Sequence, residues 1–288
     1  MILRYSNRKD TFVTSELIAV TALYDIGRGR VGRPIEQYIG WLNATLRLPL
    51  RFTIFLDPNI DASLVTLKPG DRLVRTPLEN FYPLRWEAKV DAIRSRSQSQ
   101  DLTFTLPRYA LVVMSKYDMM QRVAREEGEA CRMLWIDAGL SRFFRQDLAE
   151  GRLSSRRLER LGNAGFAAPA TKWGLKQIKE GNANSLVGQS PRLITACDMY
   201  ATGAGAIDAA DKLYAMVEQR WLPNGKWDNE QVAMGCLLAE GWPGFQVTGV
   251  NSKFGSLVED LFGVKLHRRG LPGRIQRWFD KVLGRQRP

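Results

Sequence analysis

The sequence predicts an α/β protein with a doubly wound, mostly parallel sheet flanked by helices. Short apolar, β-prone runs at residues 17–23, 51–56 and 131–136 alternate with segments of helical periodicity. The first two runs end in loops that contain glycine or proline, and the third ends on an Asp-Ala-Gly turn. Such alternation favours parallel strands joined by helical crossovers, with ligands bound beyond the carboxyl ends of the strands.

The first half of the chain opens with a β-loop-α-β unit. Strand 17–23 stops at a loop, residues 24–30, that contains two glycines and two arginines. After Pro34, apolar residues recur at i, i+3 and i+4, which predicts an amphipathic helix. Residues 51–56 are typical of a second strand, ended by an Asp-Pro-Asn turn. Further elements are expected at residues 73–75 (a weak strand), 86–96 (a helix), 109–127 (an apolar segment that begins a helix) and 131–136 (a buried strand).

The second half is expected to be mainly helical. Six arginines between positions 142 and 160 indicate an exposed helix over residues 146–163. Residues 191–198 are a candidate for a short strand. Apolar spacing predicts an amphipathic helix over residues 206–220, and Asp228 precedes one more helix over 229–240.

The charge of the chain implies an anionic partner. The formal net charge is +12, while 44% hydrophobic and 10% aromatic residues exclude a disordered basic tail. Nucleic acid, a membrane surface and phosphate-bearing small molecules all fit this charge. Residues 265–288 hold eight basic residues and one acidic residue, a local charge of +7, which leaves +5 for the rest. This distribution favours a membrane surface over nucleic acid.

Several classes of chemistry are disfavoured by residue counts. The three cysteines are too few and too scattered for a disulfide framework or a CxxC metal site. The single histidine, His267, argues against Ser-His-Asp catalysis unless the tail folds into the site, and it excludes multi-histidine zinc chemistry. No apolar segment is typical of a signal peptide or a membrane span, so we expect a cytoplasmic location.

Residues 273–288 have the pattern of a basic amphipathic helix. Apolar residues recur at i, i+3, i+4, i+7 and i+8 from Ile275, and arginine and lysine occupy the other side. Such a helix can lie on an anionic membrane surface. The alternative is a terminal helix docked on the core with a solvated basic face.

Asp137 follows an apolar strand and precedes two small residues. A carboxylate at the carboxyl end of a strand is suited to holding Mg²⁺ or Mn²⁺ against a diphosphate. The alternative is a carboxylate that only caps the turn after the strand.

Loop 24–30 combines Tyr24 and Arg28 with two glycines. Guanidinium forks and glycine amides can bind phosphate, and Tyr24 could stack on a base. The loop matches neither GxxxxGK[ST] nor GxGxxG, and a solvated turn is the alternative.

Gly203 and Gly205 precede the helix at 206–220. A GxG at a helix N-terminus can bring backbone amides close to an anion. Asp208 stands where a dinucleotide-binding loop needs its third glycine, which argues against NAD. The alternative is close packing of the start of the helix.

Asp228 and Glu230 are candidates for a general base or a second metal ligand. Asp228 with Gln231 three positions later also fits an N-capping box, which is a purely structural role.

Four blocks of the chain resemble one bacterial family. They are residues 20–29 (VTALYDIGRG), 107–116 (PRYALVVMSK), 134–140 (LWIDAGL) and 228–231 (DNEQ). Together they are similar to the WlaTC/HtrL (YibB-type) family of glycosyltransferases from surface-polysaccharide gene clusters, over residues 17–245. The resemblance implies a GT-A-like fold, a nucleoside-diphosphate sugar donor and a divalent metal.

Carried onto this chain, the resemblance implies roles for particular residues. Thr21, Tyr24, Asp25 and Arg28 would lie at the donor nucleotide, and Asp137 would hold the metal. Asp228–Gln231 would resemble the acidic segment near the transferred sugar. GT-A enzymes typically carry Asp-x-Asp, whereas position 139 is glycine, so Asp137 needs a second segment to hold a metal.

The resulting hypothesis is a glycosyltransferase that moves a sugar from a nucleoside-diphosphate donor to a glycan or lipid-linked acceptor. Residues 1–263 would form the catalytic domain, and residues 264–288 would be a basic segment at the inner face of the membrane. Mg²⁺ or Mn²⁺ on Asp137, together with Arg28 or Lys116, would neutralise the leaving diphosphate. The alternative for Lys116, which the pattern favours, is a helix-surface lysine. The alternatives are a basic nucleic-acid-binding protein without enzymatic activity and a catalytically inactive GT-A-like scaffold protein.

Overall fold

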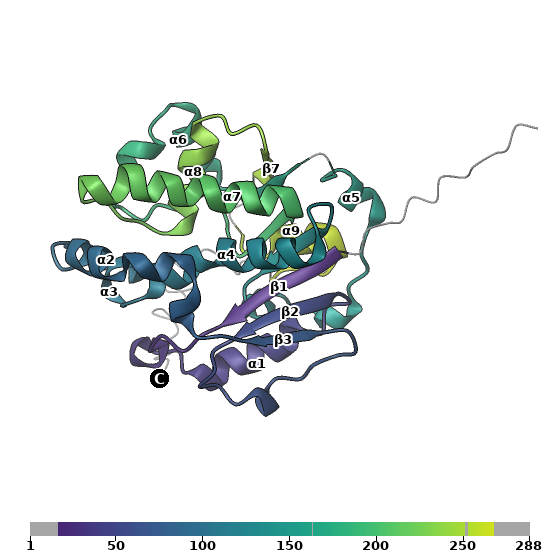
Figure 1. Cartoon of the computed structure of the whole chain (residues 1–288). Coiled ribbons are helices and arrows are strands. Elements are labelled where there is room, and N and C mark those ends of the chain that lie inside the picture. The colour runs from purple at the N-terminus through teal and green to yellow at the C-terminus, as the bar shows by residue number, and fades with distance from the viewer. Residues whose placement is uncertain (1–16, 163, 251–252, 268–288) are drawn as a thin grey trace, which may run out of the picture.

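The computed structural model describes residues 17–162, 164–250 and 253–267. Within these residues, seven strands form one sheet with helices on both faces, which confirms the predicted α/β class (Figure 1). The strands are β1 (Leu17–Leu23), β2 (Arg51–Leu56), β3 (Arg72–Arg75), β4 (Arg132–Ile136), β5 (Phe166–Ala170), β6 (Asp198–Thr202) and β7 (Phe245–Val250). The helices are α1 (Ile35–Thr45), α2 (Glu87–Arg94), α3 (Leu102–Thr105), α4 (Tyr109–Glu127), α5 (Ser155–Glu159), α6 (Lys172–Lys179), α7 (Gly203–Met216), α8 (Glu230–Ala239) and α9 (Ser256–Phe262).

The strand order across the sheet is β3-β2-β1-β4-β6-β5-β7. The first four strands in this order are parallel to one another. Strand β6 is antiparallel to both of its neighbours, and β5 is parallel to the edge strand β7. The sheet is therefore mixed, with parallel pairs in the majority, as the alternating pattern predicts.

Side-chain alternation along β1 divides the core into two parts. Val20 and the following Tyr24 belong to the part on the α4 side, whereas Leu17, Ala19 and Leu23 belong to the part on the α1 side. Because successive side chains of a strand point to opposite faces, a sheet buried on both faces needs this nearly continuous apolar run.

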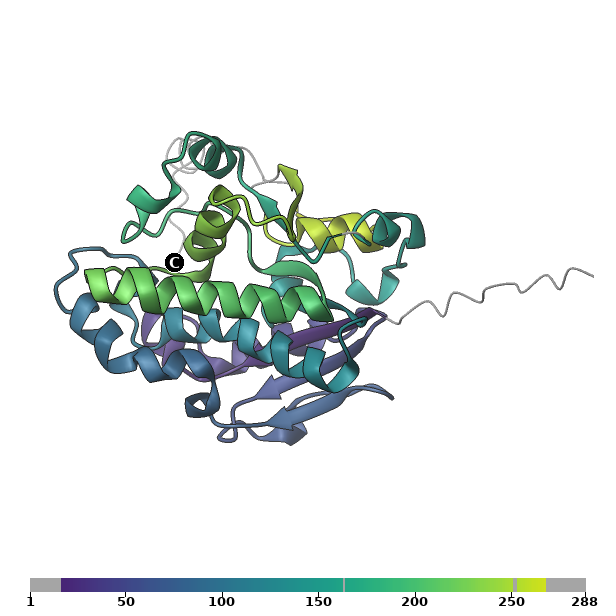
Figure 2. The same cartoon turned by 45° about the horizontal axis from the view of Figure 1, so that its top comes forward.

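The two faces carry different helices. Helices α4 and α7 pack side by side over one face, with α2 and α8 beside them, and α1 and α9 cover the other face (Figure 2). Helix α4 has 19 residues, most of its central part is buried, and it packs against β1 and β4. Lys116 lies in this buried part.

The connections place a crevice at the carboxyl ends of β1 and β4. Strand β1 leads through α1, on one face, to its neighbour β2, and the chain returns through α4, on the other face, to β4 on the opposite side of β1. Crossovers that leave a strand toward opposite faces create a topological switch point, where open α/β sheets bind ligands.

The first half of the chain follows the predicted elements within one or two residues. In the second half, the helices predicted at 206–220 and 229–240 are confirmed as α7 and α8, with bounds that differ by up to four residues, whereas two other predictions fail. The expected exposed helix at 146–163 is wrong, because only α5 and a short turn at Leu148–Glu150 form there. The expected strand at 191–198 is also wrong, since this segment makes a single β-bridge and β6 begins at Asp198. Strands β5 and β7 had no counterpart in the sequence prediction.

The carboxyl-terminal prediction lies largely outside the described residues. Val264 and Leu266 are buried in the core on the α9 side, and residues 273–288 are not described. Among the described residues, no helix combines the length and the apolar character needed to cross a bilayer.

Candidate functional site

A pocket of about 390 Å³ lies at the switch point, beyond the carboxyl ends of β1 and β4. Residues of the loop after β1 form one wall, and residues 137–143 after β4 form another. Helices α1 and α4 contribute Tyr38, Tyr109 and Lys116. The pocket thus gathers several of the predicted site residues in one place.

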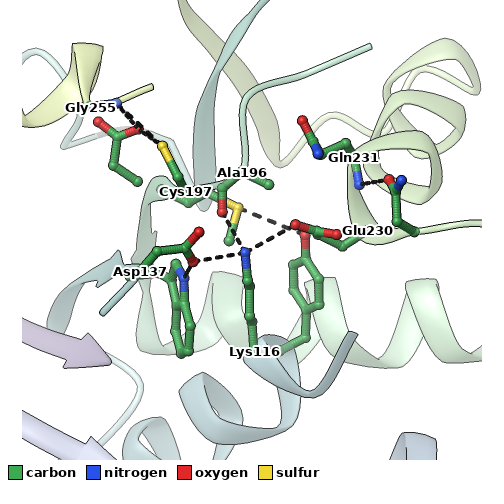
Figure 3. Close-up of polar contacts among 12 residues, drawn as sticks. Lys116, Asp137, Ala196, Cys197, Glu230, Gln231 and Gly255 are labelled. Carbon is green, nitrogen blue, oxygen red and sulfur yellow. Dashed lines mark hydrogen bonds and ion pairs between the residues drawn. The ribbon is translucent and has the colours of Figure 1, made fainter. Parts of the chain in front are cut away.

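Lys116 connects two carboxylates at the base of this pocket (Figure 3). Its Nζ lies 2.9 Å from Asp137 Oδ1 and 3.0 Å from Glu230 Oε1, and it donates to the carbonyl of Ala196 at 2.9 Å. Asp137 follows β4, Lys116 comes from α4, and Glu230 is the first residue of α8. Three elements far apart in the sequence therefore meet at one ammonium group.

The three contacts use all the hydrogen-bond donors of Lys116, because an ammonium group has three. Burial lowers the pKa of Lys116, but the charges of Asp137 and Glu230 raise it more, so the net shift is upward and the group is protonated. The structure therefore corrects the predicted role: Lys116 holds two carboxylates and has no donor left for a phosphate. A solvated helix-surface lysine is excluded too, since only 4% of Lys116 is exposed.

Asp137 is the member of this trio that opens into the pocket. Its side chain is 39% exposed, compared with 5% for both Lys116 and Glu230. Oδ1 accepts from Lys116 and from Trp135 Nε1 at 2.8 Å, and no described residue binds Oδ2. The carboxylate is thus held on one side and presents its other oxygen to the pocket.

Arg28 lines the pocket on the wall formed by the loop after β1. The backbone of Gly27 has a φ of 77°, which a residue with a Cβ rarely adopts, and the chain turns there into a short 3₁₀ helix, Arg28–Val31. Arg28 Nε donates to Tyr38 Oη at 3.3 Å, and the guanidinium lies 5.3 Å from the centroid of the Tyr109 ring.

Arg142 is a pocket residue that the sequence analysis placed elsewhere, near an exposed arginine-rich helix. It belongs to a 3₁₀ turn, Leu140–Phe143, directly after the Asp-Ala-Gly segment. Its guanidinium lies 4.9 Å from the Trp41 ring centroid and 4.6 Å from that of Phe143. Its position five residues after Asp137 is the signal that could have found it.

The other predicted donor residues are only partly brought together. Tyr24 lines the pocket, but it is 6% exposed, its ring packs edge-on against Phe81, and its hydroxyl donates to the Thr76 carbonyl. Asp25 lines the pocket and accepts from the Gly27 amide. Thr21 is buried on the α1 side of β1 and is not among the residues that line the pocket.

Gly203 and Gly205 do not belong to this site. Strand β6 is antiparallel to β4 and pairs Thr202 with Arg132. Gly203 therefore lies beyond the amino end of β4, whereas Asp137 follows its carboxyl end. The amide of Gly203 donates to the Cys131 carbonyl, and that of Gly205 to the Thr202 hydroxyl. The prediction of an anion site here is wrong, and the close-packing alternative holds.

A Cβ atom on either glycine would collide with backbone. At position 205 it would lie 1.7 Å from the Gly165 carbonyl oxygen, and at position 203 it would lie 2.4 Å from that of Gly128.

Asp228 and Glu230 are both buried, and neither lines the pocket. Asp228 accepts from the amides of Gly188, Ser190 and Asn229 and from the Ser190 hydroxyl. Burial raises the pKa of Asp228 to about 6, although these amides lower it. Helix α8 is capped by Asn229, one residue later than predicted, because its side chain accepts from Gln231 and Val232. Asp228 thus anchors a loop, and Glu230 supports Lys116.

The side chains of the pocket do not fit a resident divalent cation. Mg²⁺ and Mn²⁺ prefer several oxygen ligands, and among the described residues no three acidic, histidine or cysteine side chains are grouped to hold a metal. Asp137 offers Oδ2 alone, and a Cβ at the neighbouring Gly139 would lie 3.0 Å from Arg142 Nη1. A dication on Asp137 would face both this guanidinium and the Lys116 ammonium.

The chain was compared with solved structures, family models and curated proteins. The chain is similar in structure to the galactosyltransferase LgtC, crystallised in complex with donor and acceptor sugar analogs, with 12% sequence identity and a TM-score of 0.41. The similarity covers 76% of this chain and 70% of that chain. No family model and no curated protein matches the sequence, so the resemblance to the WlaTC/HtrL family is not confirmed.

Proposed function

We propose that this protein is a glycosyltransferase that uses a nucleoside-diphosphate sugar and transfers the sugar to a glycan or lipid-linked acceptor. The observation that carries the proposal is the pocket itself. Four cationic side chains and two carboxylates line it, together with several aromatic rings, at the switch point of the sheet. A nucleoside-diphosphate sugar combines a base that stacks on rings, a diphosphate that needs cations, and hydroxyl groups that carboxylates bind.

The chemistry requires one bond to break and one to form. The bond from the anomeric carbon to the diphosphate breaks, and its electron pair stays on the phosphate oxygen. The acceptor oxygen bonds to the anomeric carbon, and its proton passes to a carboxylate. Asp137 is the candidate for this carboxylate, because Oδ2 faces the pocket while Lys116 and Trp135 fix Oδ1.

A thermal-shift panel tests the proposal. UDP-, GDP- and dTDP-sugars are each added to the full chain, with and without Mn²⁺, and duplex RNA and DNA are tested as alternative ligands. We expect one nucleotide class to raise the Tm, because a ligand that binds only the folded state stabilises it. The matching nucleotide sugar should also be hydrolysed slowly to free nucleoside diphosphate.

Replacing Asp137 separates catalysis from binding. Asp137→Asn keeps the size of the side chain. It should slow formation of the glycosylated product by about 100-fold or more, as expected for loss of a general base. Asp260→Asn, on the surface beside Arg157, is the matched control, and its rate of product formation should equal that of the wild type. If every nucleotide sugar leaves the Tm unchanged while nucleic acid raises it, the enzyme proposal fails and the nucleic-acid alternative replaces it.

A further inference from the structure

Three arginines gather around one phenol hydroxyl in the pocket. Burial raises the pKa of Tyr38, but the positive charges around it lower the pKa more, so the net shift is downward. These charges belong to Arg28, Arg33 and Arg142. Among the described residues, none of the three guanidinium groups forms an ion pair with a carboxylate. Like charges that act on one hydroxyl group repel one another, and an anion bound among them would relieve this repulsion.

One nitrogen atom in each of two of these guanidinium groups is also shielded from solvent. The Nη1 atoms of Arg28 and Arg142 are buried and have no hydrogen-bond partner in the described part of the chain. A buried donor without a partner is costly, so two of them lining one pocket indicate a missing acceptor. Planar guanidinium forks match the oxygens of a phosphate in a two-bond geometry.

The surroundings hold both guanidinium groups in place. Arg28 is fixed by its bond to Tyr38 and by the Tyr109 ring, while Arg142 lies against Trp41 and Phe143. Tyr38 and Trp41 are themselves in edge-to-face contact, with ring centroids 5.1 Å apart. One aromatic framework therefore spans from one arginine to the other.

Gly139 leaves the space that Arg142 occupies. A Cβ at this position would lie 3.0 Å from Arg142 Nη1 and 3.5 Å from the Trp41 ring. The absence of a side chain two residues after Asp137 thus allows a guanidinium, rather than a second carboxylate, to lie beside it.

We propose that Arg28 and Arg142 bind the two phosphates of the donor, and that this pair of guanidinium groups does the work for which a divalent cation would otherwise be needed. The proposal rests on the proposed function, because it assigns the diphosphate part of that substrate. When the anomeric carbon–oxygen bond breaks, the electron pair remains on the phosphate oxygen, and the two arginines donate hydrogen bonds to the charge that develops there.

Calorimetry with inorganic pyrophosphate tests the binding step without any assay of turnover. The full chain is titrated in EDTA and again with excess Mg²⁺. We expect one pyrophosphate per chain to bind in EDTA, with an affinity that Mg²⁺ does not increase. Arg28→Gln and Arg142→Gln should each weaken binding by about tenfold or more, as for loss of a charge-assisted hydrogen bond.

Two further variants make the result specific. Arg160→Gln removes an exposed arginine that lies 3.8 Å from Asp260, and it should bind pyrophosphate as the wild type does. Gly139→Asp adds a carboxylate next to Arg142 and should weaken binding in EDTA while making it responsive to Mg²⁺. Circular dichroism on each variant confirms that the fold is retained, and only folded variants are compared.

The outcomes separate this proposal from the proposed function. Binding that appears only with Mg²⁺, or that survives both arginine substitutions, overturns the arginine pair, and the enzyme proposal stands if a nucleotide sugar still binds. If pyrophosphate binds in EDTA through both arginines but no nucleotide sugar raises the Tm, the arginine pair stands as an anion site and the glycosyltransferase proposal fails. If neither pyrophosphate nor any nucleotide sugar binds, both proposals are wrong.

Discussion

Lys116 is the residue that holds the site together, because it compensates two carboxylates with one buried charge. Replacing it by methionine keeps most of its volume but leaves Asp137 and Glu230 without their shared partner. Removing one member of a buried ion pair leaves an uncompensated charge, so we expect Lys116→Met to lower the free energy of unfolding by about 3–5 kcal/mol. Urea denaturation at neutral pH measures this change.

A second substitution shows whether the loss comes from charge. In Lys116→Met/Glu230→Gln a neutral amide replaces the buried carboxylate of Glu230. About half or more of the lost stability should return, since the effects of substitutions at residues in contact do not simply add. If the free energy of unfolding of Lys116→Met lies within about 1 kcal/mol of the wild-type value, as for most surface substitutions, the contacts among Lys116, Asp137 and Glu230 contribute little to the stability of the fold.

Sequence alone identified the residues that follow strand ends and misjudged those placed by tertiary packing. Asp137 was identified because it comes directly after a β-prone run, and Arg28 because it lies in the glycine-containing loop that follows one. Arg142 was grouped with exposed arginines, since the Trp41 ring that it lies against comes from a distant helix and cannot be seen in its own segment. Asp228 and Asn229 both fit a helix N-cap, and only the three-dimensional contacts show which of them caps α8.

At the scale of the element, the start of α7 is fixed by backbone contact with the loop before β5. Gly205→Ala would place its Cβ 1.7 Å from the Gly165 carbonyl oxygen, and no side-chain movement can relieve this contact. We expect a loss of about 3 kcal/mol or more in the free energy of unfolding, at the upper end of what overpacking costs. Thermal and urea denaturation check it.

Gly40 is the matched control, because it lies within α1 with open space around its Cβ position. Gly40→Ala should stabilise the protein by about 0.5–1 kcal/mol, the usual difference between the two residues inside a helix. A stable Gly205→Ala variant that binds nucleotide sugars less tightly would instead restore Gly205 to a ligand-binding role.

Elements in the first half were predictable because local pattern and tertiary position agree there. Strands β1, β2 and β4 are apolar and buried on both faces, which gives the continuous runs that sequence analysis detects. Strand β5 is alanine-rich and contains Pro169, so its propensity is low although every residue is buried. Strand β7 is half exposed at the sheet edge, and pairing with β5, not its own sequence, makes it a strand.

For the whole molecule, the positive charge divides between two groups of residues in the sequence. The pocket holds arginines without carboxylate partners among the described residues, and these suit a small anion. The larger share of the net charge, +7 of +12, lies in residues 265–288, most of which follow the last described element. One ligand in the pocket cannot account for that second cluster, so we propose that it contacts an anionic membrane surface.

Removing residues 273–288 tests this division of charge. The deleted segment carries four arginines and one lysine, and its sequence pattern predicts an apolar face that includes Trp278 and Phe279. Each basic residue near an anionic surface contributes about 1 kcal/mol, so the shortened chain should lose most of its binding to phosphatidylglycerol vesicles in a co-sedimentation assay. Its affinity for pyrophosphate should stay the same, because the pocket residues lie between positions 22 and 254. Full-length protein that ignores anionic vesicles, or a shortened chain that binds them equally well, would show that the basic segment docks elsewhere.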